Sequence, residues 1–217
     1  MNKRTWIIFV IIVVGIMTAL VIVSRNSSSR IDTGSISAGS VQVASDANGN
    51  IADHTSGKLD SKIILIEYGD YQCPPCASAY PIVKQLKDKY ADEILFVFRN
   101  FPIPSLHPNA RAASAAAEAA GLQNKYWEMH DKLYENQSEW SSASASQRTV
   151  IFTDYASRIG LSTDQFVQDL SQSSLVDKID FDIAVGKSAG VDATPSFRLN
   201  GESINLNDLE TTIISKL

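Results

Sequence analysis

The two cysteines of this 217-residue chain, Cys73 and Cys76, are separated only by Pro74 and Pro75. They follow an apolar run at residues 63–66, which predicts a buried strand, and they precede a segment with helix-spaced apolar residues. Two thiols at this spacing can close into a small disulfide ring and reopen, as exchange of disulfides with other proteins requires. The pattern therefore predicts a reactive dithiol in a loop between a strand and a helix.

The rest of the chain predicts strands and helices in an α/β order. Apolar runs predict buried strands over residues 62–68 and 94–98, and a strand over 194–199 leads into the hairpin turn signal Asn200-Gly201. Helix-spaced apolar residues and glycine stops predict the helices, and Pro81 is expected to kink the first of them. The helices are expected at residues 77–90, 108–120, 125–134, 149–159, from 162, 175–189 and from about 208 to the end. This order predicts an α/β sandwich with helices inserted midway.

Cys73 is expected to be the activated thiol, because the thiolate is the attacking species and Cys73 would lie at a helix N-terminus. Free backbone N–H groups and the positive end of the helix dipole favour an anion there. Pro74 and Pro75 suit a first helical turn, whose N–H groups have no partner within the helix. Cys76, one turn further on, is expected to be more buried and to react second.

Two other interpretations of the cysteine pair stay open. Half of a zinc site is one, but the remaining candidate ligands, His54, His107 and His130, are scattered without paired spacing, so no metal is expected. A purely structural disulfide is the other, although a bridge that closes so small a loop constrains the unfolded chain little.

Glu67 and the dipeptide Thr194-Pro195 are further candidates for the site. Glu67 lies on a strand that is predicted to be buried, where desolvation opposes ionisation, so it could pass protons to or from Cys76. The alternative is an acid at a strand end that reaches solvent. Pro195 opens a predicted strand and cannot donate a ladder hydrogen bond, so backbone groups beside it could pair with an extended substrate peptide.

The N-terminus predicts a membrane anchor. Residues 5–23 carry no charge, and a helix of this length rises about 28 Å, close to the hydrocarbon thickness of a bilayer. A cleaved signal peptide is the alternative, but the apolar stretch is long for one and no Ala-x-Ala-like site follows it. We expect a short cytoplasmic end at 1–4, a flexible spacer at 24–49 and one folded domain at 50–217.

The charge is distributed unevenly along the chain. Residues 1–30 hold four of the 19 basic residues and none of the 24 acidic ones, so the remainder carries a net charge of −9. Nucleic-acid binding is therefore not expected.

Four segments in the same order resemble the DsbA-like thiol–disulfide oxidoreductases, most closely their membrane-tethered bacterial branch. The first, residues 67–76, reads EYGDYQCPPC, and the others lie at 98–110, 118–133 and 194–201. The resemblance covers roughly residues 50–217. It implies a thioredoxin fold with a helical domain inserted at about 105–175.

The same resemblance implies roles for individual residues. Cys73 becomes the nucleophile, Cys76 the resolving thiol, and Pro195 a cis proline beside them, while Glu67 falls at the acidic position that these proteins often use. Pro81 matches the kink proline of thioredoxins. The Pro74-Pro75 dipeptide departs from the family, because DsbA-like oxidases often carry a histidine there that stabilises the thiolate.

These observations predict a membrane-anchored, extracytoplasmic disulfide oxidase of exported proteins, held in the cell membrane through residues 5–23. Reduced exported proteins would be its substrates, a quinone-linked membrane protein would reoxidise it, and no cofactor of its own is expected. A reductase or isomerase of the same fold, or a thioredoxin-fold binding module whose disulfide is structural, are the alternatives.

Overall fold

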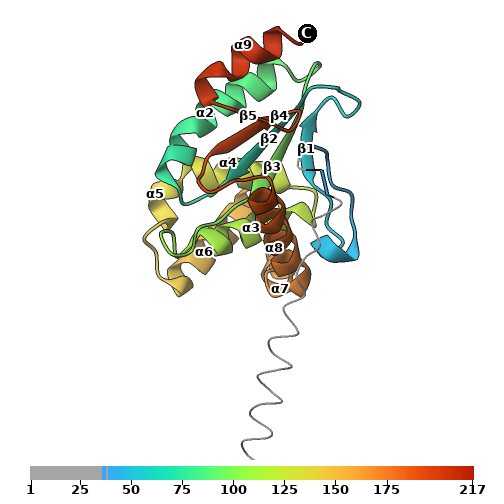
Figure 1. Cartoon of the computed structure of the whole chain (residues 1–217). Helices are drawn as coiled ribbons and strands as arrows, with labels where there is room; N and C mark the ends of the chain where they lie inside the picture. The colour runs from blue at the N-terminus through green and yellow to red at the C-terminus, as the bar shows by residue number, and fades with distance from the viewer. Residues whose placement is uncertain (1–35, 38) are drawn as a thin grey trace, which may run out of the picture. The chain divides into compact units, whose positions relative to one another are not determined.

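The structure, a computed structural model, describes residues 36–37 and 39–217. Their centre is a five-stranded sheet in the order β1-β3-β2-β4-β5 (Figure 1). The central β2 runs parallel to β3, and the other pairs are antiparallel. The strands are β1 (His54–Gly57), β2 (Ile64–Gly69), β3 (Leu95–Asn100), β4 (Ser196–Leu199) and β5 (Glu202–Ile204).

The predicted strands and the hairpin are confirmed, whereas β1 was missed. In β2 every residue from Leu65 to Gly69 is buried, as its apolar run indicates. Asn200 and Gly201 have φ angles of 53° and 88°, the left-handed pair that a tight hairpin turn requires. Strand β1, with the sequence HTSG, is short and polar, and it forms by pairing with β3 at the sheet edge rather than by apolar patterning.

Helices cover both faces of the sheet, and most of them lie between β3 and β4. Helices α2 and α9 lie side by side, with Lys89 and Glu210 paired at 2.6 Å (Figure 1). The helices are α2 (Pro74–Lys89), α3 (Ala110–Gly121), α4 (Tyr126–Glu135), α5 (Gln137–Trp140), α6 (Ala145–Arg158), α7 (Thr163–Asp169), α8 (Ser173–Ser188) and α9 (Leu209–Ile214), with 3-10 turns η1 (Asp46–Asn48) and η2 (Leu206–Asp208). The segment α3–α7 is the helical insertion of a thioredoxin fold.

Three helices begin earlier than the sequence pattern predicts, and one of them, α8, begins at Ser173 instead of residue 175. Helix α2 begins at Pro74 instead of residue 77, because prolines at its first positions need no intrahelical hydrogen bond, and Pro81 lies within it. Helix α6 begins at Ala145 instead of 149, because Ser144 and Gln147 form a capping box ahead of its apolar residues. The predicted cap of α7 is present, with the Ser162 side chain accepting from the Gln165 backbone N–H.

The side chains of β2 divide the core into two parts. Leu65 belongs to the larger apolar cluster, which also contains both cysteines and side chains from α2, α3 and α4. Ile66 and Tyr68 point into a smaller cluster with Val97, Phe101 and Val191. Glu67 therefore lies on the same side of the sheet as the dithiol.

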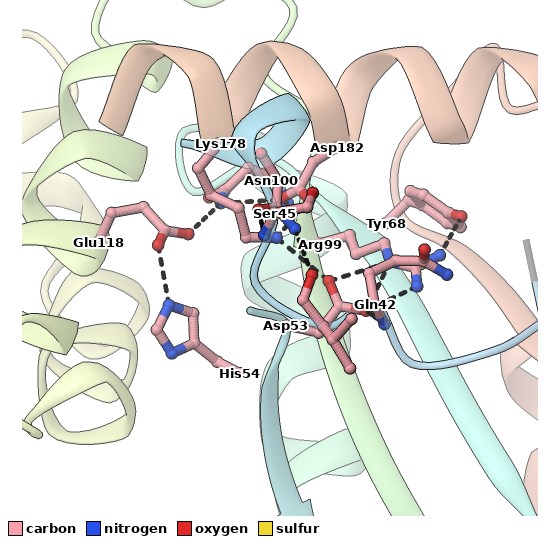
Figure 2. A network of polar contacts seen from close by, with 12 residues as sticks. Gln42, Ser45, Asp53, His54, Tyr68, Arg99, Asn100, Glu118, Lys178 and Asp182 are labelled. Carbon is pink, nitrogen blue, oxygen red and sulfur yellow. Dashed lines mark hydrogen bonds and ion pairs between the residues drawn. The ribbon is translucent and has the colours of Figure 1, made fainter. Parts of the chain in front are cut away.

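A buried network of charged groups joins β1, β3, α3 and α8 (Figure 2). Arg99 Nη2 lies 2.7 Å from Asp53, and Lys178 Nζ contacts Asp53 at 3.1 Å and Asp182 at 2.5 Å. The network continues from Asp182 through the side chains of Asn100 and Glu118 to the imidazole of His54. These contacts are Asn100 to Asp182 at 3.1 Å, Asn100 to Glu118 at 2.7 Å and His54 to Glu118 at 2.8 Å.

The same network reaches the described end of the predicted spacer at 24–49. Arg99 donates to the carbonyl oxygen of Ser40 at 2.7 Å, and the Gln42 backbone N–H donates to Asp53 at 2.8 Å. Asn48 is fully buried within η1. Residues 39–49 are thus part of the fold. Hydrogen bonds rather than apolar side chains hold them, and the composition of a segment does not reveal such bonds.

The predicted anchor at residues 5–23 lies outside the described residues. Within residues 36–37 and 39–217, every helix falls short of the length and apolar character that a membrane crossing needs.

Candidate active site

The dithiol lies where the chain leaves β2 and enters α2. Cys73 is the N-cap residue of α2, and its backbone N–H donates to the Asp70 carbonyl oxygen at 3.0 Å. Both cysteines are free thiols, and Cys76 is fully buried while Cys73 is 5% exposed. The structure therefore places the pair as the sequence predicted, with Cys73 the more accessible sulfur.

The two thiols have opposite acidities. A hydrogen bond from Cys76 lowers the pKa of Cys73 to about 6, and the nearby Thr194 side chain and Cys76 backbone N–H lower it further, against desolvation. The pKa of Cys76 is raised far above its ordinary value, because its proton is shared with Cys73, because it is buried, and because Glu67 is near. This asymmetry gives one thiolate at neutral pH, located on Cys73.

The Thr194-Pro195 bond is cis and faces the first cysteine. The carbonyl oxygen of Thr194 lies 3.4 Å from Cys73 Sγ and can accept the thiol proton. The buried hydroxyl of Thr194 has no hydrogen-bond partner within the described structure. Because the Thr194 side chain also lowers the pKa of Cys73, this hydroxyl is a candidate donor for the ionised sulfur.

Glu67 lies on β2 with 3% of its surface exposed, so the predicted burial is present. Desolvation raises the pKa of its carboxyl to about 8, and the Glu67 charge in turn raises the pKa of Cys76. A carboxyl with this pKa can take or give a proton near neutral pH.

The sequence reasoning missed two side chains that hold the active-site loop. Asp70 Oδ2 accepts from the Ile103 backbone N–H at 2.9 Å and contacts His107 Nδ1 at 2.8 Å. Gln137 on α5 donates to the carbonyl oxygens of Tyr71 at 2.8 Å and Cys73 at 3.1 Å. Asp70 adjoins the motif and was within reach of sequence analysis, whereas no local signal marks Gln137, 64 residues from Cys73.

His107 and His130, two of the three candidate ligands, occupy different places. His107 pairs with Asp70 near the dithiol, and His130 packs at 5.1 Å from the ring centre of Trp127 within an aromatic cluster. Within residues 36–37 and 39–217, no group of three His, Cys, Asp or Glu side chains is arranged to hold a metal.

Solved structures share this fold. BdbD from Bacillus subtilis, in its oxidised form, superposes with a TM-score of 0.67 at 20% identity, covering 81% of this chain and 96% of that one. The thiol–disulfide exchange protein α-DsbA2 from Wolbachia pipientis superposes with a TM-score of 0.65 at 21% identity, covering 76% and 87%. This chain therefore shares the fold of these solved structures and carries a free dithiol at the start of α2.

The sequence comparison gives the family. Residues 49–213 match the thioredoxin family model, and the chain belongs to that family. The Na(+)/H(+) antiporter NhaA 1 of Mycolicibacterium vanbaalenii is 34% identical over 153 residues, which are 69% of this chain and 23% of the antiporter. The chain thus spans about a quarter of the length of the curated relatives it matches, so their transport activity is not carried over to it.

Proposed function

We propose that this protein introduces disulfides into exported proteins through Cys73 and Cys76. The observation that supports the proposal best is the pKa of Cys73, lowered to about 6 beside a Cys76 thiol whose pKa is raised. A stabilised Cys73 thiolate favours the reduced form over the disulfide, and a dithiol that prefers to be reduced oxidises others.

Each turnover would proceed through two exchanges. A substrate thiolate attacks Cys73 in the disulfide, a mixed disulfide forms, and Cys76 leaves as a thiolate that takes a proton from Glu67. A second substrate thiolate attacks the substrate sulfur of the mixed disulfide, and Cys73 leaves as a thiolate. The substrate loses two electrons as its disulfide forms, and the Cys73/Cys76 pair gains them.

The neighbouring residues would position and assist this exchange. Pro74 and Pro75 hold both sulfurs at the first turn of α2, where free N–H groups favour the thiolate. Thr194 and Pro195 would present an extended substrate to Cys73, because they precede β4, which begins at Ser196, and the Thr194 carbonyl oxygen lies 3.4 Å from Cys73 Sγ.

We also propose that residues 5–23 anchor the protein in the cell membrane with its catalytic domain outside the cytoplasm. Their uncharged, 19-residue length supports an anchor, and a dithiol oxidant is of use outside the reducing cytosol. A quinone-linked membrane protein would then remove the two electrons. The anchor predicts that the intact chain stays in membranes after a high-salt wash and that added protease digests the domain in spheroplasts, whereas deletion of residues 1–24 releases it.

A thiol–disulfide equilibrium against glutathione, followed by refolding of a reduced substrate, tests the main proposal. We expect the Cys73–Cys76 disulfide to be reduced readily and the refolding yield to depend on it. A disulfide as resistant to reduction as an ordinary structural bridge contradicts the oxidase. A reductase or isomerase would instead accelerate exchange only when supplied with electrons.

The variant Cys73→Ser separates an enzyme from a binding module. We expect it to abolish turnover, with Cys76→Ser trapping a mixed disulfide with substrate. Substrate capture by Cys73→Ser that equals the wild type, with no covalent complex in either variant, would support a binding module instead.

A further inference from the structure

A small cavity lies between α2 and α4 on the dithiol side of the sheet. Its volume is about 10 Å³, near the minimum that one water molecule requires. Glu67 lines it from β2, Lys84 and Lys87 line it from α2, and His130 and Asp131 line it from α4. The cavity therefore joins the buried carboxyl beside Cys76 to side chains of the helical insertion.

His130 presents an unused nitrogen at this place. Its side chain is only 6% exposed, and its Nε2 has no hydrogen-bond partner within the described structure. Its Nδ1 lies 3.2 Å from Asp131 Oδ1, so the ring proton belongs on Nδ1 and Nε2 carries a lone pair. Since buried polar atoms are nearly always paired, an orphan acceptor beside a water-sized polar cavity marks a proton-binding position.

Glu67 is the matching group on the opposite wall. Burial is the sole cause that raises its pKa, and no hydrogen bond or ion pair to its carboxyl is present among the described residues. Such a carboxyl, once it has taken the proton of Cys76, needs a path to solvent before it can act again. Nothing on β2 itself supplies one, because every β2 residue from Leu65 onward is buried.

We propose that His130 relays protons between Glu67 and solvent, through one water molecule in this cavity and through Asp131. The inference rests on the proposed function, since it concerns reoxidation of the reduced pair, in which Cys76 attacks a mixed disulfide between Cys73 and the reoxidising partner. Cys76 gives its proton to Glu67, the new Cys73–Cys76 bond forms, and the partner's sulfur leaves as a thiolate. Glu67 then passes the proton through the water to His130 Nε2, and the Nδ1 proton moves to Asp131.

Asp131 completes the route because it reaches the surface. Its side chain is 22% exposed and pairs with Lys84, which is 37% exposed. A proton that arrives at Asp131 can therefore leave to bulk solvent. The relay makes His130 a positioning and proton-transfer residue, because its ring contacts neither sulfur.

The charges around the cavity keep the imidazolium short-lived. Burial lowers the pKa of His130, the charges of Lys84 and Lys87 lower it further, and Asp131 raises it. Tyr80, the remaining ionisable group on the cavity wall, has its pKa raised by burial and stays neutral. Transfer from Glu67 to His130 is therefore uphill. The pKa of Asp131 is itself lowered by His130 and Lys84 despite its partial burial, so the proton passes through Asp131 to solvent without resting there.

The test follows the attack by Cys76 directly. The reduced protein is mixed with 5,5′-dithiobis(2-nitrobenzoate): Cys73 releases one thionitrobenzoate, and Cys76 then releases the second as the disulfide closes. The variants are Glu67→Gln, His130→Gln and the double variant, with Trp127→Phe as a control that alters packing against the His130 ring without changing a titratable group. Each variant is checked for folding by its denaturant midpoint.

We expect His130→Gln to slow the second release about tenfold, below the 10²–10⁴-fold that direct acid–base catalysis contributes. Because His130 acts through Glu67, the double variant should be no slower than Glu67→Gln alone. The first release and the control Trp127→Phe should match the wild type. Asp131→Asn, at the exposed end of the route, should slow the second release in the same non-additive way and serves if His130→Gln folds poorly.

Multiplicative effects of Glu67→Gln and His130→Gln would overturn the relay, as would a second release that neither His130→Gln nor Asp131→Asn slows. These outcomes leave the proposed function intact, because the wild type would still release both thionitrobenzoates. A wild-type protein that does not release the second thionitrobenzoate would contradict the proposed function itself. This outcome is seen with the wild type alone, before any variant is compared.

Discussion

Removal of the Thr194 hydroxyl should make Cys73 a weaker acid. In the thiol form, Cys73 Sγ lies 3.4 Å from the Thr194 carbonyl oxygen, and the Thr194 hydroxyl has no hydrogen-bond partner among the described residues. This hydroxyl can therefore donate a hydrogen bond to the sulfur when Cys73 becomes a thiolate. A hydrogen bond to a charged group contributes about 1.5–3 kcal/mol, and we take the lower end because Cys76 also donates to the sulfur. Thr194→Val should then raise the pKa of Cys73 by about one unit, from about 6 to about 7.

The same change should make the protein a weaker oxidant. At pH 7, a thiolate pKa of about 7 instead of about 6 removes about 1 kcal/mol from the reduced form, which is roughly 20 mV toward a more reducing potential. The pKa is measured from thiolate absorbance against pH, and the potential from equilibrium with glutathione. Thr194→Ser, which keeps the hydroxyl, is the matched control. An unchanged pKa in Thr194→Val, or an equal shift in Thr194→Ser, would refute this role of the hydroxyl.

Three further predictions concern stability, each measured by denaturant unfolding of the reduced protein. Lys178→Met should lower the free energy of unfolding by about 3–5 kcal/mol, because it leaves Asp182 buried without its cationic partner and leaves Asp53 with Arg99 alone. Thionitrobenzoate release at Cys73 should stay unchanged, and wild-type stability in this variant would count against the network. Gln137→Glu should lower the free energy of unfolding by about 2 kcal/mol, because a carboxylate cannot donate to the carbonyl oxygens of Tyr71 and Cys73. A loss no larger than that of the same substitution at an exposed glutamine would show that these two hydrogen bonds are unimportant. The pKa of Cys73 is lowered to about 6 by folding, so the free energy of unfolding of the wild type should rise relative to that of Cys73→Ser as pH rises from 6 to 9. This advantage should be lost as pH falls through 6, and a difference that does not change with pH would contradict the lowered pKa.

Local chemistry made much of the fold predictable. Apolar runs predict buried strands, Asn200-Gly201 predicts a tight turn, and glycines mark the ends of helices. The elements that escaped prediction depend on other parts of the chain. Strand β1 forms by pairing with the edge of β3. Residues 39–49 are held by hydrogen bonds to Asp53 and to Arg99, which lies 59 residues from Ser40.

The candidate site divides in the same way. Cys73, Cys76 and Pro195 could be identified from sequence motifs, and the burial of Glu67 from the apolar residues around it. Gln137 could not be found, because its contact with Cys73 arises only when the helical insertion folds back on the loop. The role of His130 could not be found either, because its unpaired nitrogen is visible only beside the cavity that α2 and α4 enclose.

By itself the sequence determined that a dithiol would sit between a strand and a helix, because motif spacing and helix capping are properties of neighbouring residues. Tertiary structure alone decided how acidic each sulfur would be and where protons could leave. Acidity depends on burial and on donors brought from positions such as Thr194, 121 residues away, and such distances through the chain are closed only by folding.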